Sequence, residues 1–160
     1  MLAIFKLADK DVTQTQLSSW LKKDDEPEYV NLTDTSLAIF LNGLINKNRG
    51  KREGPQIKPE KKLTNNIILN KLKIALSLKS DDIIALLNTV DFNLGKAELS
   101  AFFRKPEHKH YRQCKDQILR NLLTAIQHKY RNTTPSPKVE QTSEKQVTKL
   151  KAEDIWKNDA

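Results

Sequence analysis

The sequence of this chain repeats itself at a distance of 82 positions. Residues 1–50 align with residues 83–132 without a gap, so that position 1 pairs with position 83. Eleven of the fifty pairs are identical, at Ala3, Asp9, Leu17, Ser18, Lys23, Tyr29, Asp34, Leu37, Leu41, Lys47 and Arg49. Eleven further pairs exchange one apolar residue for another. A period this long, present in two copies, indicates two tandem lobes rather than a solenoid.

The second copy predicts four helices. Thr64 is a suitable N-cap for the first helix, and Ser80-Asp81-Asp82 caps the second with carboxylates at its positive end. A turn over 91–95 follows, in which Gly95 supplies backbone freedom. Pro106 ends a short helix over 96–104, because proline disfavours a helical conformation in the preceding residue. A long helix over 115–131 completes the lobe.

Apolar residues at helical spacing mark the inward face of each predicted helix. For the four helices in turn they are Ile68, Leu72, Ala75 and Leu76; Ile83, Ile84, Leu86 and Leu87; Leu99, Phe102 and Phe103; and Ile118, Leu119, Leu122, Leu123 and Ile126.

The first copy predicts only the last three of these helices. Met1 aligns with Ile83, which lies inside the second predicted helix of the later copy. We therefore expect about twenty residues to precede Met1, by the length of the preceding helix and turn; alternatively, the first lobe evolved without that helix, as end units of repeat proteins often differ. A lobe of about fifty residues is too small to stand alone, so we expect it to dock on the second lobe and share its core.

These patterns together predict an all-α protein. Its parts are a first helical repeat over 1–49, a basic linker over 50–62, a second helical repeat over 63–131 and a disordered tail over 132–160. The tail is rich in Thr, Ser, Pro, Lys and Glu, a composition that cannot bury enough apolar surface to fold.

Composition excludes several classes of protein. A single Cys among 160 residues rules out an intrachain disulfide framework and fits a reducing compartment. No apolar run approaches the roughly 18 residues that a membrane span needs. Charged residues interrupt the start of the chain, which argues against a signal peptide. We expect a cytoplasmic protein with no membrane partner.

The net charge of +8 is spread unevenly along the chain. Residues 1–45 carry four Lys/Arg against seven Asp/Glu, residues 46–62 carry seven against two, and residues 104–131 carry eight against two. Such asymmetry can steer an anionic partner to one face. The alternative is an ordinary solvated surface.

The repeat provides a control for each candidate chemical site. Cys114 aligns with the apolar Leu32, which predicts a buried thiol rather than a nucleophile. His108, His110 and Cys114 offer three metal ligands where structural zinc takes four, and their counterparts are not ligands of that kind. We expect no cofactor and no metal.

The acidic run over 24–28 could hold a cation, but its counterpart over 106–110 is neutral to basic, so we interpret it as a loop that ends a helix. His128 aligns with Asn46 near a helix end, where a solvated side chain is expected. The chain has no Gly-rich phosphate loop and no nucleophile elbow. We therefore expect no enzymatic activity.

In each lobe, a short helix, a turn and a second short helix follow one another, as in a helix–turn–helix unit. Over 13–23, Leu17, Trp20 and Leu21 should face inward and leave polar residues outside. Polar and cationic side chains on the outer faces, in the linker and near the end of the second lobe could bond bases or phosphates. The candidate nucleic-acid contacts are Gln14, Ser18, Lys22, Lys51, Arg52, Lys96, Ser100, Arg104, Lys105 and Arg112.

The partner hypotheses remain open between two classes. Nucleic acid, either DNA or RNA, leads because of the basic linker and second lobe, although any helical hairpin gives a similar pattern and the acidic first lobe should repel phosphate. The competing hypothesis is an adaptor that contacts another protein through the first lobe or the tail, where Val147, Leu150, Ile155 and Trp156 form a weak amphipathic pattern. A small-molecule enzyme ranks third. The sequence does not predict an oligomeric state.

Four stretches resemble the YehS-like family of small bacterial proteins, which carry a duplicated domain of unknown function. They are Leu17–Tyr29, Phe40–Gly54, Asn65–Leu87 and Pro106–Leu123, and the resemblance spans residues 1 to about 131. The family implies a fold and no activity, ligand or catalytic residue. Its members usually begin with a segment like residues 65–82, which agrees with the expectation of preceding residues. The part after Asn132 departs from the shared pattern.

Overall fold

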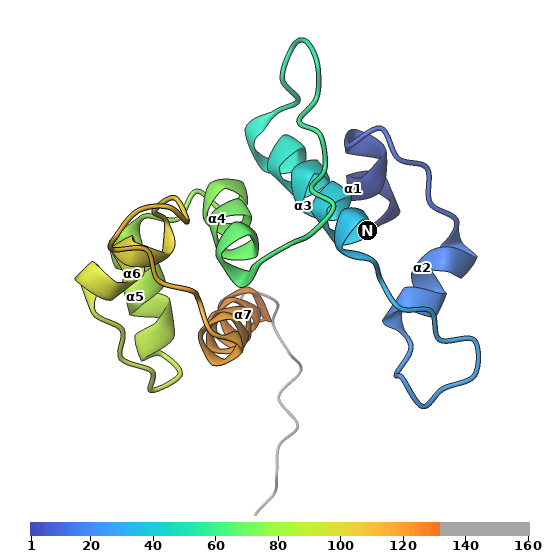
Figure 1. The fold of residues 1–160 in the computed structure, drawn as a ribbon. Coiled ribbons are helices and arrows are strands. Elements are labelled where there is room, and N and C mark those ends of the chain that lie inside the picture. The colour runs from blue at the N-terminus through green and yellow to red at the C-terminus, as the bar shows by residue number, and fades with distance from the viewer. Residues whose placement is uncertain (132–160) are drawn as a thin grey trace, which may run out of the picture.

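In the computed structural model, which describes residues 1–131, the chain forms seven helices and no strand. The helices are α1 (Leu2–Leu7), α2 (Gln14–Leu21), α3 (Asp34–Arg49), α4 (Asn65–Ala75), α5 (Ser80–Asn88), α6 (Lys96–Phe102) and α7 (Asp116–Arg131). Helices α1 and α2 lie at one end of the molecule and α5 and α6 at the other, with α3, α4 and α7 between them (Figure 1). The all-α prediction is confirmed.

The repeat of the sequence is also a repeat of the backbone. A shift of 82 residues places α3 on α7 with the same first and last residues, and places α2 on α6 within one residue. Asp9 and Asp91 both adopt a left-handed conformation, with φ of 57° and 56°. Both turns are closed alike: Asp9 N–H donates to the Lys6 carbonyl at 3.0 Å, and Asp91 N–H donates to the Asn88 carbonyl at 3.2 Å.

Asp91 rather than Gly95 provides the special backbone conformation of the 91–95 turn. Gly95 has φ of −71°, which any residue adopts, and acts as the N-cap residue of α6. The expectation that Gly95 supplies conformational freedom was therefore wrong. Aspartate tolerates the left-handed region because its short polar side chain can bond locally.

Three helices begin after a threonine that caps them. The Oγ1 atoms of Thr13, Thr33 and Thr64 each accept a hydrogen bond from a backbone N–H three residues later. This satisfies a donor that the first helical turn leaves unpaired. In α5 the predicted Ser80 cap is displaced by one residue: Lys79 occupies the N-cap position, and its N–H donates to Asp82 Oδ2 at 2.7 Å.

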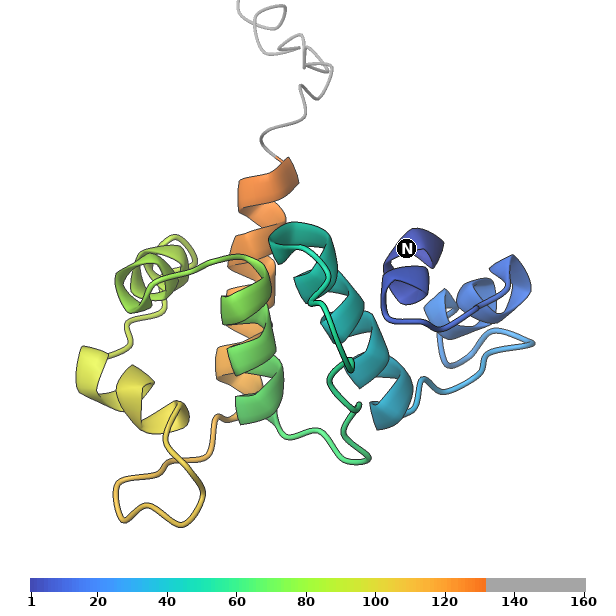
Figure 2. The same cartoon turned by 90° about the horizontal axis from the view of Figure 1, so that it is seen from above.

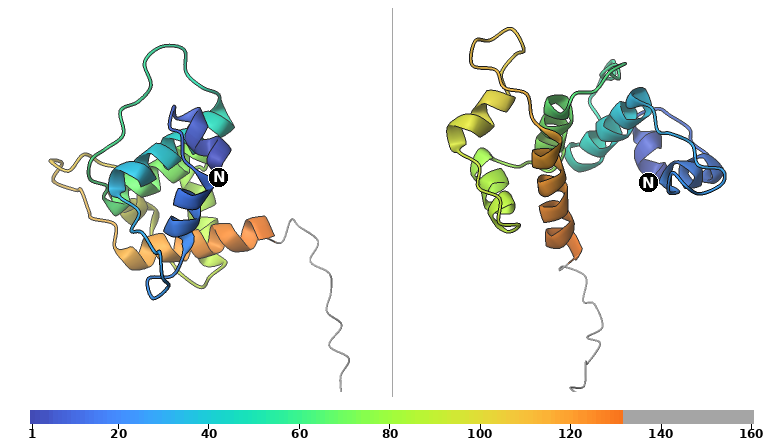
Figure 3. Two further views of the ribbon diagram at one scale, coloured as in Figure 1. Left: turned by 90° about the vertical axis from the view of Figure 1, so that its right-hand side faces the viewer. Right: turned by 60° about the horizontal axis from the view of Figure 1, so that its bottom comes forward.

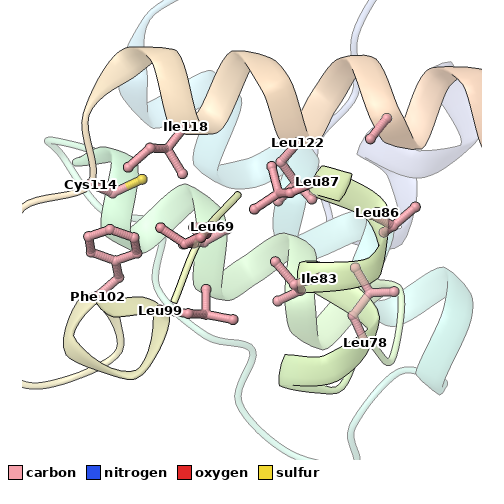
Figure 4. Close-up of a cluster of buried hydrophobic side chains, with 12 residues drawn as sticks. Leu69, Leu78, Ile83, Leu86, Leu87, Leu99, Phe102, Cys114, Ile118 and Leu122 are labelled. Atoms are coloured by element: carbon pink, nitrogen blue, oxygen red, sulfur yellow. The ribbon is translucent and has the colours of Figure 1, made fainter. Parts of the chain in front are cut away.

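The largest buried cluster lies in the second lobe. Leu69 of α4 is surrounded there by apolar residues of α5, α6, α7 and the preceding loop (Figure 4). The inward face of α4 differs from the prediction: Ile68 and Leu76 are only half-buried, and Leu69 takes their place in the core. Ile84, Phe103, Leu119 and Ile126 are also half-buried rather than fully inside.

Helix α4 joins the two lobes by packing against α3 as well as α7 (Figure 2). The Leu63 N–H donates to Asp34 Oδ2 at 3.0 Å, and Asn48 Nδ2 donates to the Ala75 carbonyl at 2.8 Å. These bonds fix both ends of α4 against α3. The main buried cluster nevertheless contains only residues of the second lobe, so the lobes share an interface and not the single core that we expected.

Two leucines predicted to face inward are exposed. Leu21 at the end of α2 is 62% exposed, and Leu123 in the middle of α7 is 45% exposed. Periodicity identifies the apolar face of a helix but does not show whether another element covers it.

Within residues 1–131, no helix combines the length and the apolar character needed to cross a membrane. The predictions made for residues 132–160, including the amphipathic pattern that ends at Trp156, lie outside the described residues.

Candidate nucleic-acid interface

The candidate contacts of the first lobe lie on the outer side of α2. Gln14 and Ser18 are exposed, as predicted. Lys22 is half-buried, and its Nζ bonds Glu28 Oε2 at 2.6 Å and the Pro27 carbonyl at 3.2 Å. The hydrogen bond from Lys22, followed by its positive charge, lowers the pKa of the Glu28 carboxyl. The loop after α2 therefore neutralises the cation that was expected to meet phosphate.

The cations of the linker lie beside α1 and α3. Lys51 Nζ bonds Asp9 Oδ1 at 2.6 Å. Arg52 lines a separate, mostly apolar pocket of about 460 Å³ with residues that include Ile39, Ile45 and Ile74.

The candidate contacts of α6 are exposed at the other end of the molecule from α2 (Figure 1). Lys96 Nζ forms an ion pair with Asp81 Oδ1 at 2.9 Å, and Ser100 is exposed beside it on the helix. Arg104 follows the end of α6, with its Nη1 3.2 Å from Nε2 of His108. The short helices α2 and α6 lie at opposite ends of the molecule (Figure 1), so their outer faces do not form one surface.

A groove of about 1330 Å³ in the second lobe brings two of the predicted residues together. Arg104 and Arg112 both line it. Lys109 and Lys115 also line the groove, although they were not among the predicted contacts. The only carboxylate among the described lining residues is Glu98, so charged groups of the groove sum to four positive against one negative. Lys105, also predicted, is exposed on the same loop without lining the groove.

Aromatic and amide side chains complete the lining of this groove. Phe92 and Tyr111 are half-buried and line the groove with aromatic side chains, while Gln113 and Gln117 line it with hydrogen-bonding amides. Cations for phosphates, together with rings on which bases can stack, are what single-stranded nucleic-acid sites combine. The excess of positive charge over 104–131 was visible in the sequence, but the groove depends on how the loop folds.

The loop that carries these cations is held by α4. Asn66 Nδ2 donates to the Phe102 carbonyl at 2.9 Å and to the Arg112 carbonyl at 2.8 Å. Asn66 Oδ1 accepts the Cys114 N–H at 2.9 Å. One buried amide thus fixes the loop at two points and ties it to the end of α6. The loop also closes on itself through Tyr111 N–H and the His108 carbonyl at 2.8 Å.

The corresponding loop of the first lobe has the same backbone and different chemistry. Backbone bonds from Glu26 to Lys23, from Tyr29 to Glu26 and from Val30 to Ser19 recur 82 residues later. The four cations of the groove correspond to Lys22, Pro27, Val30 and Thr33. The duplicated scaffold therefore presents a basic loop in one lobe and an acidic loop in the other.

Cys114 is 1% exposed, as its pairing with Leu32 predicted. Burial, followed by the nearby charge of Asp116, raises the pKa of its thiol to about 11. The thiol is therefore protonated and a poor nucleophile at neutral pH. The rings of His108 and His110 lie 5.6 Å apart, and His128 is exposed. No group of three His, Cys, Asp or Glu side chains within residues 1–131 is arranged to hold a metal ion.

A buried polar group lies between α4 and the first lobe. Lys71 Nζ bonds Asn42 Oδ1 at 2.6 Å and Glu60 Oε1 at 3.1 Å. Lys71 and Asn42 are both less than a tenth exposed. The pairing compensates the cost of burying the ammonium group, and it ties the linker to both α3 and α4.

Residues 1–50 and 65–132 match the family model described as "Protein of unknown function (DUF1456)". The chain is 42% identical over 127 residues to the "Uncharacterized protein YehS" of Escherichia coli (strain K12), an alignment that covers 79% of this chain and 81% of the relative. No solved structure matches the chain. The chain belongs to this family, and the resemblance stated from the sequence is confirmed.

Proposed function

We propose that this member of the family is a non-enzymatic protein that binds a nucleic-acid strand in the basic groove of the second lobe. Arg104, Lys109, Arg112 and Lys115 would contact phosphates, and Phe92 and Tyr111 would contact bases by stacking. The single buried thiol suits a reducing compartment, so we place this role in the cytoplasm.

The observation that carries this proposal is the difference between the two copies of one loop. Both copies keep the same backbone bonds, yet only the second gathers cations around a groove. Stability of the loop does not require these charges, because the first lobe forms the same loop with acidic residues in it. The positive charge of the second loop is therefore best explained by an anionic partner.

Salt dependence gives a quantitative test. Four phosphates neutralised on a single strand predict that log affinity falls with log salt concentration at a slope of about −3, at roughly −0.7 for each phosphate. Fluorescence anisotropy with labelled single-stranded DNA and RNA of about 16 nucleotides, and with a duplex, would measure both the slope and the preferred partner. An affinity that does not change with salt, or no binding at low salt, would contradict the proposal.

A charge-matched pair of variants separates the groove from the rest of the surface. Arg104→Gln with Lys109→Gln should weaken binding about tenfold or more. It should also make the slope of log affinity against log salt shallower by about 1.4, which corresponds to the loss of two phosphate contacts. Lys51→Gln with Lys96→Gln removes the same charge from residues paired with Asp9 and Asp81, and should leave the affinity within about twofold. Equal losses in both variants would point to nonspecific attraction instead.

A second candidate is an adaptor that binds another protein through the first lobe. The acidic loop over 24–28 is flanked by apolar residues that remain exposed, with Leu21 at 62% and Val30 at 51%. Leu21→Ser with Val30→Ser should weaken a protein complex and leave oligonucleotide binding unchanged. The groove variant Arg104→Gln with Lys109→Gln should do the reverse.

A further inference from the structure

The linker between the two repeats is folded against α3 and is held at both ends. It turns back after Gly50 and returns along α3 to Leu63, whose N–H donates to Asp34 Oδ2 at the start of that helix (Figure 3). Near its other end, Lys51 Nζ bonds Asp9 Oδ1 in the turn after α1 at 2.6 Å. The linker therefore has a defined course over the first lobe and can form one wall of a binding site.

A pocket of about 460 Å³ lies where this linker meets α3, α4 and the turn after α1. This volume falls within the range of roughly 300–1,000 Å³ that is typical of small-molecule sites. All four elements contribute to the lining, and three of them contribute large apolar side chains. These side chains are Ile39 and Ile45 of α3, Ile57 and Pro59 of the linker, and Ile74 of α4.

The amide groups at this pocket bond the protein itself. Asn46 Nδ2 donates to the Leu7 carbonyl at 2.9 Å and to Gln56 Oε1 at 3.1 Å. Asn42 Nδ2 donates to the Ile57 carbonyl at 3.4 Å. A strongly polar ligand such as a sugar would leave hydroxyl groups unpaired against the apolar lining, and each unpaired group would cost binding free energy. The pocket therefore favours a ligand with an apolar body.

The charged groups at the pocket favour an anionic head on that body. Lys10, Arg49 and Arg52 line the pocket, are exposed, and form no ion pair within residues 1–131. Asp9 is the only carboxylate among the described lining residues, and Lys51 neutralises it. A guanidinium group binds a carboxylate through two parallel hydrogen bonds, so two free arginines suit this head group.

The duplication shows that the apolar lining is not a requirement of the repeated fold. Ile39 and Ile45 correspond to Asn121 and Gln127 of α7, where the same helix has polar residues at these positions. Both isoleucines are only half-buried, and Ile57 of the linker is 52% exposed. Their side chains are therefore partly open to a ligand instead of being covered by the linker and α4.

We propose that this pocket binds a small amphipathic anion, with a medium-length apolar body against the isoleucines and a carboxylate head at Arg49, Arg52 and Lys10. The bound molecule would contact α3, the linker and α4 together and so stabilise their packing. The site is independent of the basic groove, because none of the described residues lines both.

Isothermal titration calorimetry of the full chain with octanoate tests both halves of the ligand. We expect saturable binding of one molecule per chain. Octanol lacks the charge and acetate lacks the body, so both should bind at least about tenfold more weakly. Hexanoate should also bind about tenfold more weakly than octanoate, because it buries two fewer methylene groups. Octanoate should raise Tm, since it binds the folded chain.

A pair of variants with equal loss of charge tests the head group. Arg49→Gln with Arg52→Gln should weaken octanoate binding about tenfold, to the affinity of octanol. Lys47→Gln with Lys62→Gln removes the same charge from exposed positions that do not line the pocket. This control should keep the affinity for octanoate within about twofold of the parent, because solvent screens distant surface charges.

The second repeat supplies the substitutions that test the apolar body. Ile39→Asn with Ile45→Gln introduces the residues that α7 carries at the same positions, and should abolish octanoate binding. Circular dichroism checks that α3 remains helical in this variant. The arginine variant tests the same pocket through exposed side chains, so it gives a result even where the isoleucine variant fails to fold.

Several results would overturn the proposal. Equal affinity for octanoate and octanol would show that the arginines do not bind the head group. Uptake that does not saturate would show general adsorption to apolar surface, and equal losses in the arginine and lysine variants would show general attraction of anions. Arg104→Gln with Lys109→Gln should bind octanoate as the parent does, so loss of oligonucleotide binding and loss of octanoate binding are separate outcomes.

Discussion

Leu41 and Leu123 allow the contribution of α4 to the first lobe to be measured with a single substitution made twice. Each is the eighth residue of its helix, since α3 begins at Asp34 and α7 at Asp116. Replacement by alanine removes three carbon atoms in both cases. Helix propensity and the unfolded chain change alike, so the difference between the two variants reports the folded environment.

The expected magnitudes follow from burial. Three carbon atoms correspond to about 2.4 kcal/mol of transfer free energy at about 0.8 kcal/mol for each. Leu41 is 4% exposed, so Leu41→Ala should lose nearly all of this and a further cavity contribution, about 3 kcal/mol in total. Leu123 is 45% exposed, so Leu123→Ala should lose about 1.3 kcal/mol with no cavity. The two variants should differ by about 2 kcal/mol.

Urea unfolding followed by circular dichroism measures both free energies of unfolding. The comparison requires equal m values, which show that the unfolded states are equivalent. If the two variants lose the same free energy within about 0.5 kcal/mol, either α4 does not cover Leu41 or another element covers Leu123. Either result would refute the contrast between the two lobes.

Three further predictions concern single residues. Gly43→Ala should destabilise the protein by about 2 kcal/mol or more, despite the helix preference of alanine, because the new Cβ would collide with the Ile4 carbonyl oxygen. Stability equal to the parent in urea would show that α1 does not approach α3 so closely. Asn66→Ala should lower the free energy of unfolding by about 2–4 kcal/mol and speed hydrogen exchange of the Cys114 amide, because three hydrogen bonds are lost. Asn70→Ala, on the exposed side of α4, should change neither quantity much. The folded protein holds the Cys114 pKa at about 11 against an ordinary 9.0, so it binds the thiol proton more tightly than the unfolded chain and loses stability as pH rises between about 9 and 11. In the Cys114→Ala variant, the fall in the free energy of unfolding over this pH range should be smaller by up to about 2–3 kcal/mol. Parallel curves of unfolding free energy against pH for the two proteins would contradict the assigned cause.

The architecture was largely predictable because duplication and helical periodicity are both local in the sequence. Thr64 capped α4 as predicted, and the copy of the last three helices appeared in register. The errors share a physical origin. Leu21 and Leu123 have the spacing of core residues, but burial depends on a covering element that neither pattern specifies. The left-handed residue of the 91–95 turn was predicted to be Gly95, because glycine is the commoner residue in that conformation, but it is Asp91.

The candidate interface was only partly predictable. Arg104 and Arg112 were selected for charge, and they line the groove. Lys109 and Lys115 were missed, because their approach to the groove depends on a loop fixed by Asn66, 43 and 49 positions away in the sequence. Lys51 and Lys96 were selected for charge and prove to be paired with carboxylates. Composition reveals how many cations a segment has, whereas only the fold reveals which of them are neutralised.

The position of α4 has a consequence for how the molecule opens. It supplies Leu69 to the main buried cluster while its other side packs on α3, so the lobes cannot part without disturbing a helix on which that cluster depends. Separation of the lobes and melting of the second lobe should therefore coincide in one cooperative transition. The duplicated chain should then unfold in calorimetry as a single cooperative unit, although its sequence contains two repeats.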